Sequence, residues 1–272
     1  MNQLVSSCND LLYQVREKSP LIHNITNYVT VNDCANVILA IGASPIMADD
    51  KQEVEDIVSI SSSLVLNMGT LNEDTIVSMI MAGKRANELN LPVIFDPVGA
   101  GASKLRNQTA KHILSQVKIN VIRANLSEIS FLAGFKASTK GVDSSKEDEK
   151  NDPISLAKTV ANKYSCIVGV TGEVDYISDG SRLARINNGN RLLSKVTGTG
   201  CMASALVASF CGATRDHYIA TLAGIATMAI SGEIAFEKAG KKGTVSFRNA
   251  IIDNISNMNS KIFSERGKID EI

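Results

Sequence analysis

Short runs of apolar, largely β-branched residues alternate along this sequence with longer segments whose apolar residues recur at helical spacing. Residues 63–67 and 92–96 are two such short runs, and the amphipathic segment 74–89 separates them. Two strands joined through a helix of this length run parallel to each other. A parallel sheet is buried on both faces and therefore needs helices on each side. The alternation predicts an α/β fold whose mainly parallel central sheet lies between two helical layers.

The same patterns place the remaining elements and suggest one domain that covers residues 1–272. The expected strands are residues 21–25, 44–48, 63–67, 92–96, 120–123 and 166–170, followed by a hairpin of 175–178 and 182–186 around Asp179-Gly180. The expected helices are residues 4–15, 29–41, 54–60, 74–89, 105–117, 127–132, 154–163, 203–210, 219–236 and 247–263. Residues 136–152 are dense in Lys, Asp, Glu and Ser, which predicts a surface loop within the domain.

Composition excludes several classes of partner. Lys plus Arg and Asp plus Glu both number 28, and no basic stripe is present, so nucleic acid is not an expected partner. The five cysteines are widely spaced and form no Cys-x-x-Cys pair, which favours free thiols in a cytoplasmic protein. The N-terminus has no secretory signal pattern, and the apolar run 218–232 is too short to cross a bilayer. We therefore expect no membrane association.

The stretch Val-Thr-Gly-Thr-Gly-Cys-Met at residues 196–202 precedes a run of small apolar residues that predicts a buried helix. Gly198 and Gly200 allow a tight turn and a close approach of the backbone to a ligand. The free N–H groups and the dipole at a helix start bind anions, phosphate above all. Cys201 falls in the first turn, where the same field favours a thiolate. A purely structural glycine turn is the alternative interpretation.

Other polar residues follow the predicted strands. Asp96 ends one strand before the glycine-rich loop 97–102, where it could bind Mg²⁺ or simply cap the turn. Asn125 and Glu128 have the spacing of a capping box, but they could also face a metal–phosphate cluster. Arg123 beside them could neutralise phosphate charge.

Three further positions are weighed in the same way. Thr171 ends a later strand and could donate its hydroxyl to phosphate or ribose, whereas Glu173 and Asp175 are expected to be solvated hairpin charges. Met47 could line an apolar pocket or belong to the core. His23 could be a base, but a structural role is the expected one. Neither a P-loop nor an early Gly-x-Gly-x-x-Gly is present.

Taken in order, these motifs resemble the ribokinase-like superfamily of small-molecule kinases, and more narrowly the hydroxyethylthiazole kinase family. The resemblance rests on residues 23–28, 42–48, 66–71, 96–102, 123–128, 170–175, 195–201 and 243–247, which together extend over nearly the whole chain. Relatives in the superfamily usually have Asp where Cys201 stands, and Cys at this position is typical of the thiazole kinases. The resemblance implies a three-layer αβα ribokinase-like fold.

The resemblance also implies an activity and a set of site residues. The activity is phosphorylation of the hydroxyl of 4-methyl-5-(2-hydroxyethyl)thiazole with ATP and Mg²⁺, in a homotrimer whose sites lie at subunit interfaces. Cys201 would be catalytic; Met47, Gly198 and Asn27 would bind the thiazole; Arg123, Thr171, Asn125, Thr199 and Gly200 would bind ATP; and Asp96 and Glu128 would lie at the metal. Two alternatives remain, namely a related kinase of hydroxymethylpyrimidine or another small alcohol such as a sugar, and a non-catalytic nucleotide-binding regulator.

Overall fold

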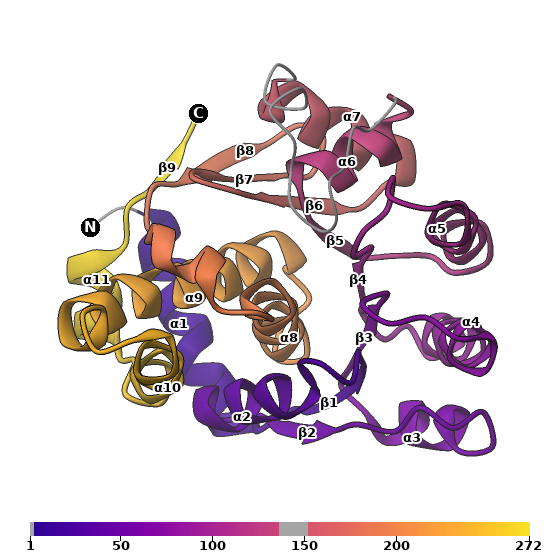
Figure 1. Ribbon diagram of the computed structural model, residues 1–272, viewed down its shortest axis with the longest axis horizontal. Helices are drawn as coiled ribbons and strands as arrows, with labels where there is room; N and C mark the ends of the chain where they lie inside the picture. The colour runs from indigo at the N-terminus through magenta and orange to yellow at the C-terminus, as the bar shows by residue number, and fades with distance from the viewer. Residues whose placement is uncertain (1–2, 136–151) are drawn as a thin grey trace.

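One curved sheet runs through the part of the chain that the computed structural model describes, residues 3–135 and 152–272 (Figure 1). Its nine described strands are β1 (Leu21–Ile25), β2 (Ser44–Ile46), β3 (Ser63–Asn67), β4 (Val93–Asp96), β5 (Val121–Asn125), β6 (Ile167–Thr171), β7 (Asp175–Ser178), β8 (Leu183–Ile186) and β9 (Ile269–Glu271). They lie in the order β2-β1-β3-β4-β5-β6-β7-β8-β9. The pairs from β2 to β6 are parallel, and β7, β8 and β9 continue the sheet antiparallel.

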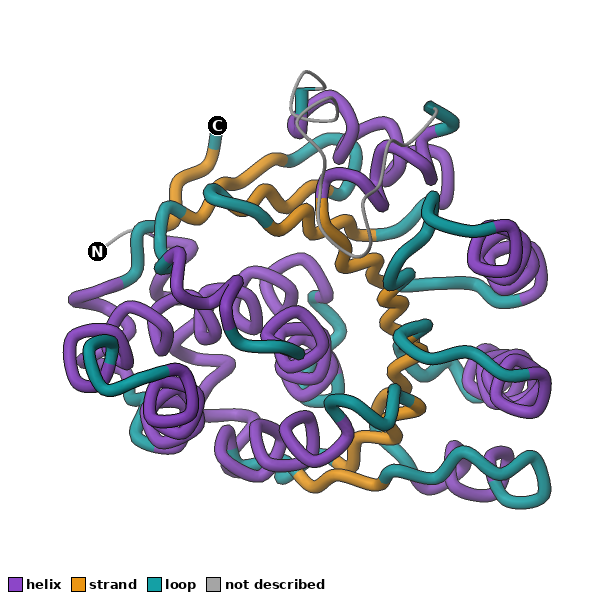
Figure 2. Tube along the Cα trace, in the orientation of Figure 1, coloured by secondary structure: helices purple, strands orange, loops and turns teal. Residues whose placement is uncertain are grey.

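Helices cover both faces of this sheet, as Figure 2 shows. One layer consists of α1 (Gln3–Lys18), α2 (Val31–Ile41), α8 (Thr199–Cys211), α9 (His217–Ala239), α10 (Thr244–Ser256) and α11 (Ser260–Arg266). The other consists of α3 (Val54–Ile60), α4 (Glu73–Glu88), α5 (Lys104–Gln116), α6 (Leu126–Ala133) and α7 (Pro153–Tyr164). The predicted three-layer αβα arrangement is confirmed.

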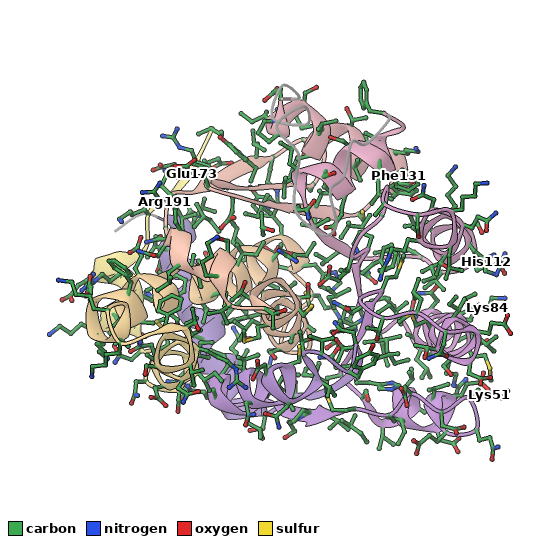
Figure 3. All side chains as sticks on the ribbon, viewed as in Figure 1. Lys51, Lys84, His112, Phe131, Glu173 and Arg191 are labelled. Atoms are coloured by element: carbon green, nitrogen blue, oxygen red, sulfur yellow. The ribbon has the colours of Figure 1, made fainter. Side chains whose placement is uncertain are left out.

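Alternation along the strands divides the core in two. Val65 and Ile94 pack with α1, α2 and α8 to α11, whereas Leu66 and Phe95, one position later, pack with α3 to α7. The outer surface of the second layer is solvated, and Figure 3 shows Lys84 on its outside. Because these strands are buried on both faces, nearly all their residues are apolar, and the sequence therefore predicted them as short apolar runs.

The start of α8 is fixed by two glycines that admit no side chain. Gly198 has φ 86°, a left-handed conformation, and a Cβ there would lie 2.5 Å from Cγ2 of Thr30. A Cβ on Gly200 would lie 2.6 Å from a guanidinium nitrogen of Arg123. Gly198 is therefore required for the turn, and Gly200 allows the Arg123 guanidinium to approach the first turn of α8 closely.

Helix α9 is longer than the apolar run in the sequence suggested. In the described part of the chain it is the one helix that is long and apolar enough to cross a membrane, with 23 residues and a mean hydropathy of 1.6 in its most apolar window. However, 83% of that window is buried inside the protein. Its length and apolar composition are accounted for by its position in the core.

Two sequence expectations at the C-terminal end were wrong. The single helix over residues 247–263 is two helices, because Asn259 accepts a hydrogen bond from the N–H of Ile262 and begins α11. Strand β9 was not predicted; it pairs with β8 and extends the hairpin. The predicted loop lies outside the described residues except for Asp152, which caps the start of α7.

Candidate active site

A row of polar side chains crosses the carboxyl edge of the parallel strands, on the face that packs against α8. Asn67 ends β3 in register with Asp96, which ends β4. Arg123 of β5 and Thr171 of β6 continue the row on the same face by the two-residue alternation of strands. Open α/β sheets bind ligands outside the carboxyl ends of their strands. This row and the start of α8 therefore form the candidate active site.

Cys201 lies half-buried in the first turn of α8 and faces the row. Its Sγ accepts hydrogen bonds from Nδ2 of Asn27 at 3.4 Å and from Nδ2 of Asn67 at 3.3 Å. Burial and the charge of Asp96 raise the pKa of the Cys201 thiol, and hydrogen bonds from three side chains only partly oppose them. In the free protein, desolvation and the charge of Asp96 therefore oppose the thiolate that the field of the helix start would favour.

Asp96 is a fully buried carboxylate with one oxygen in use. Its Oδ2 accepts from Nδ2 of Asn67 at 2.8 Å and from Oγ of Ser204 at 2.7 Å, and it lies 3.7 Å from Arg123. Burial raises the pKa of Asp96, although Arg123 and these hydrogen bonds act in the opposite direction. Among the described residues Oδ1 has no hydrogen-bond partner. The carboxylate therefore does more than cap its own turn, and it offers a free oxygen at the site.

Arg123 bridges the strand ends and the helix start. Its guanidinium donates to Oγ1 of Thr171 at 2.5 Å, lies 3.7 Å from Asp96 and packs against Gly200. Its Nε is buried and has no hydrogen-bond partner in the described part of the chain. A guanidinium with a free donor beside a helix N-terminus is suited to bind phosphate oxygens.

Asn125 and Glu128 form a capping box at the start of α6. Oδ1 of Asn125 accepts from the N–H of Glu128, and Oε2 of Glu128 accepts from the N–H of Asn125, both at 2.9 Å. Oε1 of Glu128 accepts from the N–H of Gly99 at 2.8 Å. Burial and the charge of Asp96 raise the pKa of Glu128 to about 7. The capping interpretation is confirmed, while the roles at ATP and metal stay predictions.

Thr199 is the other residue predicted at ATP. Its hydroxyl donates to the carbonyl of Leu193 at 3.2 Å, in the short 3-10 helix η2 (Arg191–Lys195). The backbone N–H groups of Thr199 and Gly200 belong to the first turn of α8, where intrahelical acceptors are lacking. These N–H groups are the part of the turn suited to an anion.

Met47 lines a cavity of about 150 Å³ between β1, β2 and the start of α4. The cavity is also lined by the Asn24 and Thr26 side chains, whose amide and hydroxyl are buried without hydrogen-bond partners among the described residues. Asn27 follows Thr26 in the chain, but its side chain contacts Cys201 and does not line the cavity. The structure thus places Met47 at a pocket near the row, as a substrate-binding residue would require.

His23 and Asp175 complete the comparison with the sequence. Nε2 of His23 lies 2.8 Å from the carbonyl of Ala48, and burial lowers the pKa of His23, which fits the expected structural role. Asp175 was expected to be solvated, but it is buried and accepts from the N–H of Gly172 at 2.9 Å. Burial raises the pKa of Asp175 to about 7. Glu173 is exposed as expected (Figure 3).

The sequence reasoning missed four residues of the site: Asn24, Thr26, Asn67 and Ser204. Asn67 carried a usable signal, since it is a polar residue at the last position of a buried strand that precedes the strand of Asp96. Asn24 carried the same signal near the end of β1, whereas Thr26 and Ser204 carried none, because their places depend on how the loop after β1 and α8 pack.

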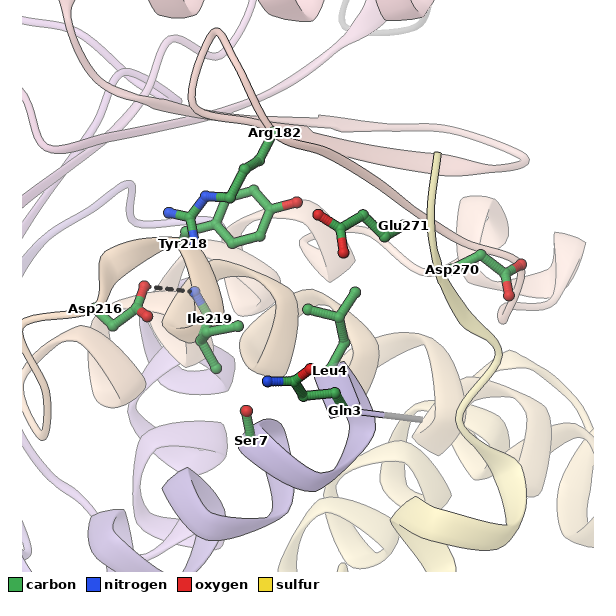
Figure 4. Close-up of a pocket in the computed structure, with 9 residues that line it drawn as sticks. All are labelled: Gln3, Leu4, Ser7, Arg182, Asp216, Tyr218, Ile219, Asp270 and Glu271. Atoms are coloured by element: carbon green, nitrogen blue, oxygen red, sulfur yellow. Dashed lines mark hydrogen bonds between the residues drawn. The ribbon is translucent and has the colours of Figure 1, made fainter. Parts of the chain in front are cut away.

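A second and larger cavity, of about 490 Å³, lies away from this row (Figure 4). It is lined by residues of α1, β9 and the start of α9, together with Arg182. A Cβ on Gly212, just past the end of α8, would touch Pro20 and Ser62, which precede β1 and β3. The end of α8 and the start of α9 therefore lie at the amino edge of the strands, opposite the candidate active site.

Comparisons with known proteins agree with this geometry. The model of the hydroxyethylthiazole kinase family matches residues 12–261. The chain is 61% identical to hydroxyethylthiazole kinase of Ruminiclostridium cellulolyticum over 273 aligned positions, with 100% of both chains covered. It is 58% identical to that of Clostridium beijerinckii, covering 100% of this chain and 99% of the relative.

Solved structures extend the agreement to the fold. A hydroxyethylthiazole kinase structure from Pyrococcus horikoshii superposes with a TM-score of 0.89 at 38% identity, covering 97% of this chain and 98% of that one. A pyridoxal kinase structure from Staphylococcus aureus shares the fold, with a TM-score of 0.55 at 16% identity, covering 78% of this chain and 86% of that one. On its sequence and its structure, this chain belongs to the hydroxyethylthiazole kinase family.

Proposed function

We propose that this protein transfers the γ-phosphoryl group of ATP to the hydroxyl of 4-methyl-5-(2-hydroxyethyl)thiazole. The observation that carries the proposal is the convergence of Cys201, Asp96 and Arg123 at the start of α8, in a chain of this family. Phosphoryl transfer depends on positioning and charge stabilisation more than on covalent chemistry of the protein. The cluster supplies groups that can position the substrates and groups that can stabilise charge.

The phosphates of ATP are proposed to bind between the strand ends and α8. Arg123 and Thr171 would hold them from the sheet, while Thr199 and Gly200 would donate their backbone N–H groups. Asn125 lies in the same strand-end region, next to the β6 end that carries Thr171.

The thiazole is proposed to enter the cavity beside Met47, with its hydroxyl directed at Cys201. Asn27 and Gly198 would border the path between cavity and thiol. The raised pKa of Cys201 leaves its thiol protonated at neutral pH. A loose transition state requires the hydroxyl proton to leave only late in the transfer. We therefore assign Cys201 the placing of the hydroxyl rather than its early deprotonation.

The residues at this site fit a magnesium ion, because Asp96 offers a carboxylate oxygen that could bind it. The free and buried Oδ1 of Asp96 is an oxygen of the kind that Mg²⁺ prefers. Across residues 3–135 and 152–272, no three His, Cys, Asp or Glu side chains are grouped to hold a metal by themselves. Mg²⁺ commonly completes its coordination with water and substrate phosphates, so Asp96, with Glu128 beside it, would suffice. The ion would neutralise phosphate charge.

An assay of ADP release tests the proposal. Thiazole alcohol, hydroxymethylpyrimidine and ribose are compared at saturating ATP and Mg²⁺. The thiazole alcohol is expected to give the highest kcat/KM, since this chain belongs to the hydroxyethylthiazole kinase family. Faster turnover of the pyrimidine or the sugar would favour the related-kinase alternative. ATP binding without turnover of any alcohol would favour a regulator.

We also propose a homotrimer whose subunits share the site, and a cytoplasmic location. Tyr28 lines the small cavity and is 80% exposed, and the neighbouring Val29 is 55% exposed. Apolar side chains exposed at the rim of a substrate cavity are typical of a surface that another subunit covers. The free cysteines suit a reducing compartment. A sedimentation experiment that finds a monomer at all concentrations would contradict the trimer.

A further inference from the structure

Asn67 lies at the centre of the polar row, and both the nitrogen and the oxygen of its side-chain amide are hydrogen-bonded. It is 0% exposed, at the end of β3. Its Nδ2 donates to Oδ2 of Asp96 at 2.8 Å and to Sγ of Cys201 at 3.3 Å. Its Oδ1 accepts from Nδ2 of Asn27 at 2.9 Å and from the N–H of Gly69 at 2.9 Å. One side chain thus connects the thiol, the carboxylate and the second amide that contacts the thiol.

The orientation of this amide is fixed by a group that has no alternative role. The N–H of Gly69 can only donate, so the atom that faces it must be the oxygen of Asn67. The NH₂ group must then face Asp96 and Cys201. The sulfur of Cys201 is therefore an acceptor in this contact, and its own hydrogen must point elsewhere.

We propose that Asn67 is a positioning residue, which holds the Cys201 sulfur and the Asp96 carboxylate in one fixed arrangement and acts on phosphoryl transfer through them. The inference rests on the proposed function. Asp96 keeps Ser204 as a donor, and Cys201 keeps Asn27 and Thr30, so neither group loses all its partners with Asn67. However, Asn27 also loses its acceptor when Asn67 is removed. The relative placement of thiol and carboxylate is then no longer fixed.

Asn67→Ala is the first test, and Ser63→Ala is its matched control. Ser63 lies on the same strand and face, is fully buried, and donates to the carbonyl of Ala208 in α8, away from Cys201. Asn67→Ala is expected to lower kcat by about 10- to 100-fold, the effect of one hydrogen bond to a charged group. The KM values for ATP and thiazole alcohol should stay within about threefold, because the substrates do not bind to Asn67. Ser63→Ala should leave kcat near that of the wild type.

A cycle with Cys201→Ala separates positioning from general stabilisation. If Asn67 acts through the thiol, Asn67→Ala should cost clearly less kcat in the Cys201→Ala background than in the wild type. Full additivity, or a kcat of Asn67→Ala equal to that of Ser63→Ala, overturns the inference. An increase in KM with unchanged kcat overturns it as well, since Asn67 would then act on binding.

Asn67→Asp keeps the test decisive if the alanine variant does not fold. This variant retains an oxygen toward Gly69 and Asn27, but its carboxyl group has at most one proton and so cannot donate to both Asp96 and Cys201, as the NH₂ group does. It is expected to lose at least as much kcat as Asn67→Ala, and wild-type kcat overturns the inference. The wild type is assayed in parallel: absence of thiazole turnover there contradicts the proposed function, whereas additivity in an active enzyme contradicts only the role of Asn67.

Discussion

The cavity beside Met47 and the larger cavity at the amino edge of the strands differ in whether the polar groups that line them are paired, and not only in size. The larger, of about 490 Å³, is lined by groups that are largely paired or exposed: Arg182 donates to Asp179 at 2.7 Å and lies 4.1 Å over the Tyr218 ring, and Asp216 caps α9. The smaller, of about 150 Å³, is lined by the buried and unpaired side chains of Asn24 and Thr26.

The difference shows where the protein keeps polar groups available for a ligand. Leaving a buried polar group without a partner costs free energy, so such groups at a strand edge indicate a binding role. In the described part of the chain, Asp96 and Arg123 also keep a free atom, and both lie at the same carboxyl edge of the sheet as the smaller cavity. The buried hydroxyl of Tyr218 is the exception at the larger cavity. Burial raises the pKa of Tyr218 to about 12, so this group stays neutral.

The largest expected effect comes from Cys201. Cys201→Ala should lower kcat by about 10²- to 10⁴-fold or less, because a group at the reacting hydroxyl is lost but phosphate binding remains. Cys201→Ser should resemble the alanine variant, since a hydroxyl is a poor base. Cys201→Asp should keep or raise kcat, because Asn27 and Asn67 can donate to a carboxylate that is already ionised.

Initial rates at saturating ATP and Mg²⁺ decide this point. Wild-type rates for Ala and Ser with an inactive Asp variant would make Cys201 a packing residue.

Arg123 tests the phosphate side of the same region. Arg123→Ala should raise the Kd of ATP by about 10- to 100-fold, since a charge-assisted hydrogen bond is lost. Thiazole binding should change little, because Arg123 contacts Thr171 and Gly200 rather than the Met47 cavity. Calorimetric titration of each substrate measures both. Equal ATP affinity in wild type and variant would give Arg123 a purely structural role.

The buried carboxyl group of Asp175 makes the stability of the protein depend on pH. Asp175 accepts from Gly172, and its pKa is raised to about 7 in the folded protein against an ordinary value of 3.8. The unfolded chain therefore ionises first, and stability falls as pH rises from about 4 through about 7. Asp175→Asn keeps an acceptor for the N–H of Gly172 and removes the loss of stability that accompanies ionisation of the carboxyl group.

The Tm of Asp175→Asn minus that of wild type is therefore expected to grow between pH 5 and pH 8. A gain of roughly 2–4 °C corresponds to about 1 kcal/mol in a chain of this size. Thermal unfolding followed by circular dichroism checks this result. A difference that is constant across the pH range would mean that Asp175 is ionised in the folded protein throughout.

The smallest effect is expected at the larger cavity. Arg182→Ala should leave kcat and the Kd of ATP within about twofold of wild type and should cost about 1 kcal/mol or less, the usual value of a half-exposed ion pair. It is the matched control for Arg123→Ala, since both variants remove an arginine that pairs with an aspartate. A large loss of activity in Arg182→Ala would invalidate the distinction between the two cavities.

Much of this site was predictable because strand ends are local features. Asp96, Arg123 and Thr171 each follow an apolar run, and the rule that parallel strands end at one edge brings them together. Gly198 and Gly200 were readable in the same way as a turn before a helix. The nearly continuous apolar runs come from a sheet buried on both faces, so the fold was predictable as well.

The rest depends on contacts between distant parts of the chain. Asn67 and Cys201 are 134 residues apart, and Ser204 and Asp96 are 108 apart, so no local pattern joins them. Asp175 was read wrongly because turn residues around a hairpin indicate exposure, whereas tertiary packing buries it. The helix start indicated one influence on the Cys201 thiol, but the burial that raises its pKa could not be read from the sequence.

The central position of α8 has a consequence for how the chain acquires its shape during synthesis. Helix α8 packs on β1, β3 and β4, yet it is encoded at residues 199–211, long after those strands have left the ribosome. Until then, apolar side chains such as Ile22, Val65 and Ile94 have no helix α8 to cover them. Contacts between such distant segments slow folding and prolong the exposure of apolar surface that can aggregate. The nascent kinase is thus most vulnerable to aggregation, and most dependent on chaperones, in the interval before residue 211 emerges.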